Sequence, residues 1–421
     1  MKIPGGFRAL RECLRIRNFR LYVIGNIAHG LGIWLLRMTI GWLAWELEKS
    51  TAWLGAVAMA ETAPSLILSL VAGTLVDRLN FVRMMQLTQA LSAALAAGLA
   101  VLTLTGAISI WILFVLTVCR GCLMAFNRSS RMVLLHHLVG RDLLAPALAI
   151  GSIIHNGTRF IGPAVGGVII AGAGIGWGFA SASALIALYA IILVVLPIDL
   201  PARKREPRSM IADIREGFVY ILGHPGIRVQ LALLAVMGIV ARPVVDLLPG
   251  YAGQVFARGA DGLAMLLAAY GIGATLAGVW IASRAAGLAG MTRLSILSVL
   301  FVSIMLAAFV ATPVFWVGLV ASTLLGFGLL VLTVTSQTLI QSAVDQPFRG
   351  RVISVHGLIM VGVPSLGALA LGGLAEVFGL RLPVLAGAAI FMAVWAVAWR
   401  HRRVLAASLE HVAPEATEQK A

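Results

Sequence analysis

Seven ionisable side chains interrupt the long apolar runs of this sequence: Arg37, Glu61, Arg120, His155, Arg159, Arg242 and Asp246. A charge inside a membrane-spanning helix costs free energy, so such residues usually bind substrates or ions or transfer protons. Two of the seven are carboxylic acids. Burial favours the protonated form of such a group, and a neighbouring arginine favours the ionised form. The sequence therefore predicts Glu61 or Asp246 as a site that binds and releases a coupling proton.

The spacing of these residues predicts which of them lie together. Arg37 lies about eight residues before the end of its apolar run and Glu61 about eight after the start of the next, so they share a depth and can pair. Two further pairs are four residues apart and so share a helix face: His155 with Arg159, and Arg242 with Asp246. We predict that all six line a central cavity. The alternative is that the acid–base pairs are structural bridges between helices.

A short basic connector follows the second apolar run, and it contains Gly73, Asp77, Arg78 and Arg83. An aspartate at such a helix end can cap a neighbouring helix, attract its N-terminus or pair with a nearby arginine. We predict that this connector acts in gating. The alternative is a plain loop whose charges only set the orientation of the chain.

The fifth apolar run combines Gly162, Pro163, Gly166 and Gly167. A proline in a helix interior removes a hydrogen bond and kinks the helix. The flanking glycines allow another helix to pack closely against the bend. A thin, kinked helix of this kind suits a gate, and simple small-residue packing is the alternative.

The composition excludes a soluble domain. Of the 421 residues, 60% are hydrophobic and 12% are charged, whereas soluble domains carry about 25% charged residues. The net charge of +15 comes from Lys and Arg gathered in short segments between apolar runs. That pattern is typical of membrane orientation, so we expect a lipid bilayer as the surroundings and no nucleic-acid partner.

The pattern predicts an all-α polytopic protein with about twelve transmembrane helices, each near the roughly 20 residues that a span needs. The predicted spans are residues 19–45, 53–76, 84–105, 108–134, 143–171, 177–197, 228–256, 262–283, 292–311, 314–340, 351–378 and 383–399. Basic connectors alternate with nearly uncharged or acidic ones, which places both termini in the cytoplasm.

The two halves of the chain are similar. Gly121 and Gly328, Ser129 and Ser336, and Gly166 and Gly373 are each separated by about 207 positions. Parallel repeats of this kind build many secondary transporters around a site at mid-membrane. We predict a six-helix bundle in residues 1–200, a cytoplasmic linker with an amphipathic helix in 201–227, a second bundle in 228–405 and a disordered cytoplasmic tail in 406–421.

The connector after the second span resembles the signature of the major facilitator superfamily between its helices 2 and 3. Gly73, Asp77 and Arg78 match Gly-x-x-x-Asp-Arg, Asn80 stands in place of a glycine, and Arg83 matches a later basic residue. The resemblance implies two pseudo-symmetric six-helix bundles that work by alternating access.

Two further motifs indicate a branch of that superfamily. Gly162-Pro163-x-x-Gly166-Gly167 is similar to the helix-5 motif of exporting, antiporting members, and Arg120-Gly121 resembles their helix-4 arginine motif. Runs at 18–22, 41–43, 53–55, 351–354 and 372–376 resemble the drug-antiporter branch that includes macrolide and enterobactin exporters. The resemblance implies a multi-pass protein of the bacterial inner membrane, which usually works as a monomer.

We therefore expect a secondary active transporter, not an enzyme, that exports a small amphipathic solute such as a drug, siderophore or other metabolite by proton antiport. An arginine-rich cavity favours a substrate with negative charge or many acceptor oxygens. The alternatives are a lipid or lysophospholipid translocator and, from another class, a transport-inactive sensor or scaffold. We expect no cofactor and no metal, since Cys119 and Cys122 form one C-x-x-C pair and a zinc site needs four ligands.

Overall fold

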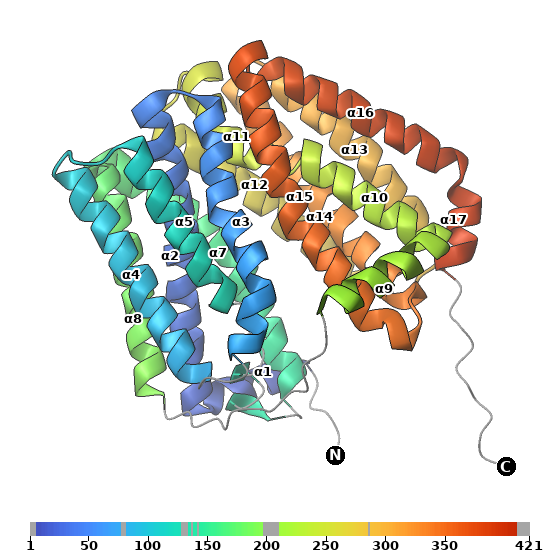
Figure 1. Ribbon diagram of the computed structural model, residues 1–421, viewed down its shortest axis with the longest axis horizontal. Helices are drawn as coiled ribbons and strands as arrows, with labels where there is room; N and C mark the ends of the chain where they lie inside the picture. The colour runs from blue at the N-terminus through green and yellow to red at the C-terminus, as the bar shows by residue number, and fades with distance from the viewer. Residues whose placement is uncertain are drawn as a thin grey trace. The chain divides into compact units, whose positions relative to one another are not determined.

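The computed structural model describes residues 6–76, 81–127, 134–135, 138–140, 143–196, 210–284 and 287–410. Every regular element of these residues is helical, which confirms the predicted all-α class (Figure 1). The chain forms two compact units. Unit 1 comprises Met1–Pro207 and Leu248–Gly271, and unit 2 comprises Arg208–Leu247 and Ile272–Ala421.

The described residues of the first part of the chain form seven helices, of which the six after α1 match the first six predicted spans. They are α1 (Gly6–Arg15), α2 (Arg17–Glu48), α3 (Thr51–Val76), α4 (Phe81–Leu104), α5 (Ile110–Asn127), α7 (Leu144–Ala173) and α8 (Ile175–Val195). The helices of the second part begin with α9, which lies within the predicted linker 201–227. They are α9 (Met210–Gly223), α10 (Pro225–Val240), α11 (Val244–Gly250), the π-helical η1 (Tyr251–Val255), α12 (Ala260–Ala282), α13 (Met291–Ala311), α14 (Phe315–Ala343), η2 (Gln346–Phe348), α15 (Arg349–Phe378), α16 (Arg381–Arg400) and α17 (Arg402–Leu409).

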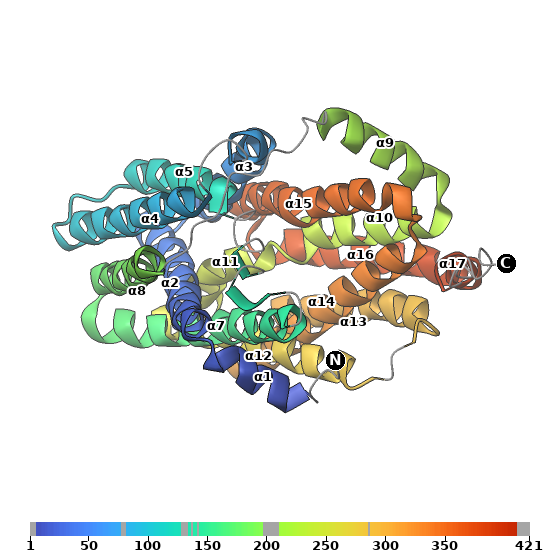
Figure 2. The ribbon, with the colours of Figure 1, turned by 90° about the horizontal axis from the view of Figure 1, so that it is seen from below.

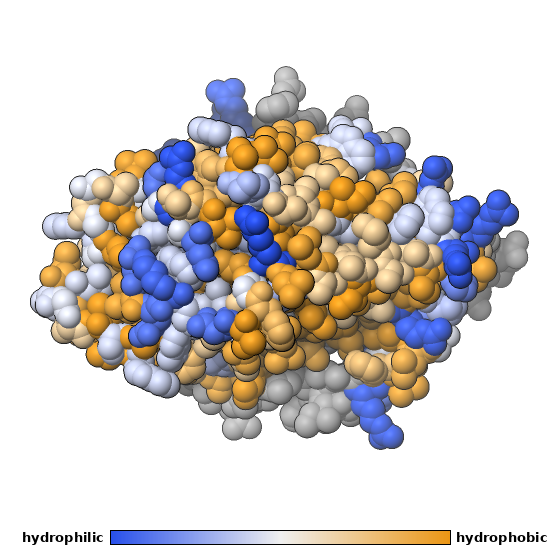
Figure 3. All heavy atoms as spheres, turned by 90° about the horizontal axis from the view of Figure 1, so that it is seen from above, coloured by the Kyte–Doolittle hydropathy of each residue, from blue (hydrophilic) through white to orange (hydrophobic). Residues whose placement is uncertain are grey.

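Ten apolar segments of the described chain are long enough to cross a membrane, and α5 adds a shorter one at Ile110–Phe126. The remaining predicted span, 143–171, corresponds to α7, which has 30 residues but carries His155, Asn156 and Arg159 and is therefore less apolar. Apolar residues cover much of the face drawn in Figure 3, which agrees with a bilayer as the solvent.

Within unit 1, α2 packs between α7 and α8, and α3 packs on α5 (Figure 2). Small residues set these distances. A Cβ atom at Gly25 would lie 2.7 Å from Cδ2 of Tyr189, so only glycine lets α8 approach α2 here. The connection from α7 to α8 is the single residue Gly174, whose φ of 96° is strained for any residue with a side chain. Unit 1 is thus a close-packed bundle built around α2.

The seventh predicted span, 228–256, is not one continuous helix. It divides into α10, a turn at 241–243, α11 and the π-helical η1. Pro243 has no N–H to continue the helical ladder, and the amide of Arg242 bonds to Met237 O at 3.0 Å, five residues back. The predicted span is present as the apolar segment Pro225–Val255, and its helix is interrupted at this turn.

The predicted disorder of residues 406–421 does not extend to 406–410. Leu405 and Leu409 of α17 are buried, and Leu409 packs beside Gly226 at the start of α10. The carboxylate of Glu410 accepts bonds from the amides of Gly290 (2.9 Å) and Thr292 (2.8 Å). It thereby satisfies free donors at the N-terminus of α13, as an acidic cap does. Residues 411–421 lie outside the described residues.

Candidate functional site

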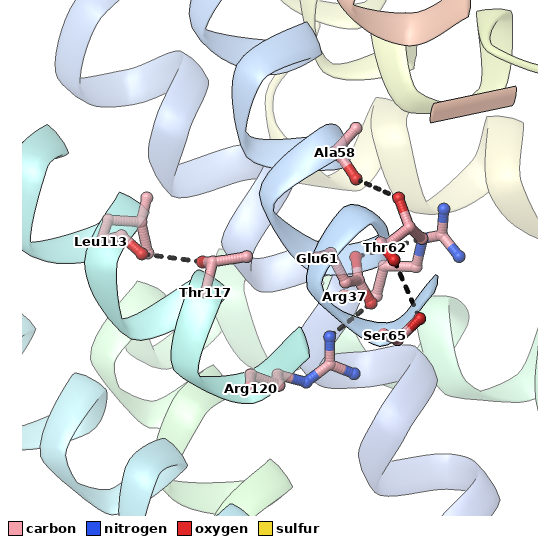
Figure 4. Close-up of polar contacts among 8 residues, drawn as sticks. All are labelled: Arg37, Ala58, Glu61, Thr62, Ser65, Leu113, Thr117 and Arg120. Carbon is pink, nitrogen blue, oxygen red and sulfur yellow. Dashed lines mark hydrogen bonds and ion pairs between the residues drawn. The ribbon is translucent and has the colours of Figure 1, made fainter. Parts of the chain in front are cut away.

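The carboxylate of Glu61 lies between two arginines from two other helices of unit 1 (Figure 4). Nη1 of Arg120 on α5 donates a hydrogen bond to Oε1 of Glu61 on α3. Nε of Arg37 on α2 lies 3.8 Å from Oε2. The side chains of Glu61 and Arg120 are 7% and 4% exposed, and that of Arg37 is 35% exposed. The expected pairing of Arg37 with Glu61 is present, but Arg120 makes the closer and more buried bridge.

The close approach of α3 and α5 depends on Gly121, the residue after Arg120. A Cβ atom at this position would lie 2.7 Å from Glu61 O and 2.8 Å from Ala60 O. Neighbouring hydroxyls are turned to their own helices: Thr62 bonds to Ala58 O at 2.9 Å and Thr117 to Leu113 O at 2.7 Å (Figure 4). Gly121 therefore allows α5 to approach α3, and Arg120 then bridges the two helices.

A second cationic site surrounds Trp34 on α2. The guanidinium carbon of Arg159 on α7 lies 5.5 Å from the Trp34 ring centre and 5.0 Å from that of Tyr270 on α12. The guanidinium carbon of Arg37 lies 5.8 Å from the Trp34 ring centre, and the His155 ring centre lies 6.3 Å from it. Stacking of guanidinium on aromatic faces is a favourable contact of about 0.5–2 kcal/mol.

Trp34 thus links the two arginine sites, and neither it nor Tyr270 was among the predicted site residues. Trp34 precedes Arg37 by three positions, a spacing that puts both on one helix face and could have indicated its role. Tyr270 could not be found in this way, because it comes from a distant part of the chain. Both residues belong to unit 1 together with Arg159.

The motif on α7 holds this helix against two neighbours. A Cβ atom at Gly162 would lie 2.7 Å from Trp34 Cβ, and one at Gly166 would lie 3.2 Å from Met38 Sδ, so both glycines face α2. A Cβ atom at Gly167 would overlap Ala264 of α12. Pro163 is buried inside the same helix. The small residues therefore have a packing role, whatever movement the proline allows.

A cavity of about 320 Å³ lies in unit 1 between the first halves of α2 and α7. Its polar lining includes Asn26, Ser152, His155 and Asn156, and its aromatic lining includes Tyr22. A volume of this size is within the range of small-molecule sites. His155 therefore lines a cavity on one side and faces Trp34 on the other.

Arg242 and Asp246 are placed differently from the expectation. Arg242 is an exposed residue of the turn between α10 and α11, and Asp246 lies in the first turn of α11. The two residues do not share the face of one regular helix, because the backbone breaks at Pro243 between them. Both belong to unit 2, whereas Arg37, Glu61, His155 and Arg159 belong to unit 1.

The predicted gating loop is described only at its ends. Gly73 lies in the last turn of α3, and Arg83 is exposed in the first turn of α4. Asp77 and Arg78 lie outside the described residues. Among the described residues, no group of three or more His, Cys, Asp or Glu side chains could hold a metal ion. Cys119 and Cys122 are free thiols.

A bundle of apolar helices with buried charges and a polar cavity defines the chain as a multi-pass membrane protein of the transporter class. A family model described as "Transmembrane secretion effector" matches residues 11–419. The chain belongs to this family, within the major facilitator superfamily of membrane transporters.

Three curated relatives are named as transporters or exporters. The chain is 28% identical over 358 residues to the staphyloferrin A transporter of Staphylococcus aureus, covering 83% of this chain and 87% of the relative. It is 27% identical over 380 residues to the multidrug efflux pump Tap of Mycolicibacterium fortuitum, covering 87% and 91%. It is 26% identical over 333 residues to the enterobactin exporter EntS of Shigella boydii, covering 78% of each.

Two solved structures share the fold. A bacterial homologue of the human lysosomal transporter Spinster, inward-facing and occupied, aligns with a TM-score of 0.72 at 15% identity, covering 94% of this chain and 99% of that one. A bacterial homologue of the iron transporter ferroportin, inward-facing, aligns with a TM-score of 0.70 at 15% identity, covering 91% and 98%. These likenesses confirm the predicted major facilitator fold.

Proposed function

We propose that this protein is a secondary active transporter that exports a small, acceptor-rich or acidic amphipathic solute by proton antiport and alternating access. The observation that carries the proposal is a contrast between two arginines of unit 1. Arg120 is neutralised by the buried carboxylate of Glu61. Arg159 has two aromatic rings and, among the described residues, no carboxylate against it.

Arg159 is suited to bind substrate because its charge is available. The rings of Trp34 and Tyr270 fix the plane of the guanidinium without consuming its hydrogen-bond donors. A planar guanidinium with free donors recognises carboxylates and similar oxygen groups, often with two bonds. His155 and the cavity beside it add neutral polar and aromatic contacts for the rest of the solute. We therefore assign the substrate-binding role to Arg159, with Trp34 and Tyr270 as positioning residues.

Glu61 is suited to carry the proton. Its carboxylate contacts both Arg37 and Arg120, so protonation changes the charge that faces both arginines in one step. The helices α2, α3 and α5 are joined by this carboxylate, and its neutralisation therefore weakens their connection. Because Arg37 also contacts Trp34, a change at Glu61 reaches the Arg159 site through one intervening side chain. Asp246 of unit 2 is the alternative proton site.

The names of the relatives support the class of solute. Two are named for siderophores, enterobactin and staphyloferrin A, and one for multidrug efflux. Arg159, which has no carboxylate against it in the described part of the chain, fits an oxygen-rich acidic solute such as a siderophore better than a lipophilic cation. We propose the siderophore-like class first and drug-like solutes second.

The remaining assignments follow from the sequence and the family. We propose a bacterial inner-membrane location, cytoplasmic termini, a monomeric transporter, and the division into bundles 1–200 and 228–405 that alternate around a central site. The loop with Gly73, Asp77, Arg78 and Arg83 and the helix α7, which contains Pro163, are the proposed gates. In that arrangement Arg242 and Asp246 supply the second bundle's share of the site.

The test is accumulation of candidate solutes in a host that lacks its own efflux pumps, at matched expression, with and without a protonophore. Wild type is compared with Arg159→Ala, Glu61→Gln and the control Glu46→Gln, whose carboxylate forms an exposed pair with Lys49 at 2.8 Å. Wild type and control should lower accumulation of an acidic or siderophore-like compound, and the protonophore and both site variants should abolish this.

Two results would contradict the proposal. Efflux of lipophilic cations alone, unaffected by Arg159→Ala, rules out the assigned substrate class. No change for any compound rules out drug and siderophore export, and labelled phospholipid and lysophospholipid are then tested in vesicles.

A further inference from the structure

The helix α9 has two faces of different character. Its inner face packs on α15, where a Cβ atom at Gly217 would lie 3.0 Å from Arg351 O, and Ile221 is 5% exposed. Figure 2 shows α9 beside α10 and α15. The inner face is therefore already occupied by unit 2.

The opposite face is apolar and exposed. Phe218, Val219 and Leu222 are 50%, 65% and 55% exposed, and Arg215 is exposed among them. At about 100° per residue these four positions share an arc of roughly 100° on the helix, which we call the outer stripe. Three large apolar side chains on one narrow arc are costly in water and suit a membrane surface.

The charges of the outer stripe and of the sequence that precedes and follows it are mainly basic. Arg215 lies within it, and Arg228, whose Nη1 bonds to Leu222 O at 3.4 Å, is exposed at its end. The sequence just before α9 adds four basic residues, Arg203, Lys204, Arg205 and Arg208. Against these stand Glu206, Asp213 and Glu216, and Glu216 is already paired with Arg351 at 3.0 Å. The segment therefore keeps a net positive charge.

The place of α9 in the chain, directly before a membrane span, indicates what covers the outer stripe. Only His224 separates α9 from α10, and α10 begins an apolar run of 31 residues, Pro225–Val255, that is long enough to span the bilayer. The outer stripe therefore lies where a span meets the membrane surface. We propose that α9 binds anionic lipid headgroups of the membrane that this chain spans, with Phe218, Val219 and Leu222 inserted among the acyl chains and Arg215 among the phosphates.

The inner face connects this lipid contact to the transport machinery. The Tyr220 hydroxyl donates to Asp345 Oδ2 at 3.0 Å and accepts from the Asp345 amide at 3.1 Å. The Tyr220 ring stacks on Phe348 with centres 4.5 Å apart. These contacts and the Glu216–Arg351 bridge fasten α9 to the α14–α15 connection and to the first turn of α15. Lipid bound to α9 therefore restrains α15. The effect of this restraint on transport is a second inference, which rests on the proposed transport function. The lipid binding itself does not rest on that function.

The binding is tested on the full chain in vesicles. Cys13, Cys119 and Cys122 are replaced by alanine, and a nitroxide is attached at Val219→Cys or, as control, at Gln346→Cys, an exposed polar position of the α14–α15 connection. Accessibility to oxygen and to a water-soluble nickel chelate is measured in phosphatidylcholine with and without phosphatidylglycerol. With phosphatidylglycerol, the label at 219 should be open to oxygen and shielded from nickel, while the label at 346 stays open to nickel.

Two outcomes overturn the inference. Equal nickel access at 219 and 346 in phosphatidylglycerol vesicles shows that the outer stripe is in water. Equal shielding at 219 in both vesicle types shows apolar insertion without selection of anionic lipid. Adding Arg215→Gln should raise nickel access at 219 severalfold in the phosphatidylglycerol vesicles.

The label is read without any solute, so failure of the proposed transport function leaves this result intact. For the restraint on α15, Arg215→Gln should reduce the stimulation of solute transport by phosphatidylglycerol without changing transport in phosphatidylcholine alone. Equal stimulation of wild type and variant overturns the connection to α15.

Discussion

Arg120 on α5 donates a hydrogen bond to Glu61 on α3, and both side chains are almost fully buried. Removing one partner of a buried ion pair leaves the other charge uncompensated and costs about 3–5 kcal/mol, whereas exposed pairs contribute at most about 1 kcal/mol. The bridge therefore fixes the position of the carboxylate and makes its charge state matter to the packing of three helices.

Thermal stability should depend on the buried ion pair more than on an exposed one. We expect Glu61→Gln and Arg120→Gln each to lower the thermal unfolding temperature of the purified protein. The double variant Glu61→Gln/Arg120→Gln should recover part of the loss, because it removes both buried charges and leaves only the partly exposed Arg37 beside a neutral side chain. Export should stay lost in all three. The control Glu46→Gln should unfold like wild type, and an equal loss in the control would contradict the buried bridge.

The aromatic setting of Arg159 predicts a specific defect in Arg159→Lys. Lysine keeps the charge but loses the flat stack on Trp34 and Tyr270 and the paired donors. We expect an apparent affinity for the acidic solute about 2- to 30-fold weaker, the equivalent of 0.5–2 kcal/mol, with a smaller effect on maximal rate. Concentration-dependent efflux from proteoliposomes measures both quantities. Unchanged affinity in this variant would show that Arg159 does not touch the solute.

Gly121 should tolerate no side chain. Its Cβ position lies too close to the carbonyl oxygens of Ala60 and Glu61, so Gly121→Ala must push α5 from α3 and lengthen the Arg120–Glu61 bridge. We expect a loss of about 1–3 kcal/mol in unfolding free energy, the usual cost of overpacking. Gly98→Ala on α4 is the control, since a Cβ there meets nothing within 4 Å and alanine favours a helix. An equal change in unfolding free energy in Gly121→Ala and Gly98→Ala would argue against close packing at Gly121.

The attachment of α9 should weaken at high pH. Burial and the Asp345 carboxylate raise the pKa of the Tyr220 phenol from its usual value of 10.0, against the smaller opposing effect of the Asp345 amide. A folded-state pKa above the unfolded value means that this stabilisation is complete below pH 10 and is lost as the pH rises through the raised pKa. The mobility of a label at position 219 should therefore increase above pH 10. In Tyr220→Phe the label should be more mobile at neutral pH and should lack this transition.

The class of protein, its helices and its candidate charged residues could be predicted from the sequence. Apolar runs of span length specify helices in a bilayer, because every backbone group must be bonded internally there. Depth along a helix follows from residue count, which is why the pairing of Arg37 with Glu61 could be predicted. The departure of the backbone from a regular helix between Arg242 and Asp246, where Pro243 lies, could not be predicted in this way.

Contacts between side chains on different helices could be identified only from the tertiary structure. Arg120 and Glu61 are 59 positions apart, and their contact depends on the glycine that lets α5 approach α3. Tyr270 reaches Arg159 because α12 packs on α7, where Gly167 and Gly271 leave room. Likewise, the apolar spacing of α9 predicted an amphipathic helix, but only the structure shows that Ile221 is buried while Phe218, Val219 and Leu222 are exposed. Periodicity identifies a helix face, but the neighbour that covers it depends on how the helices pack.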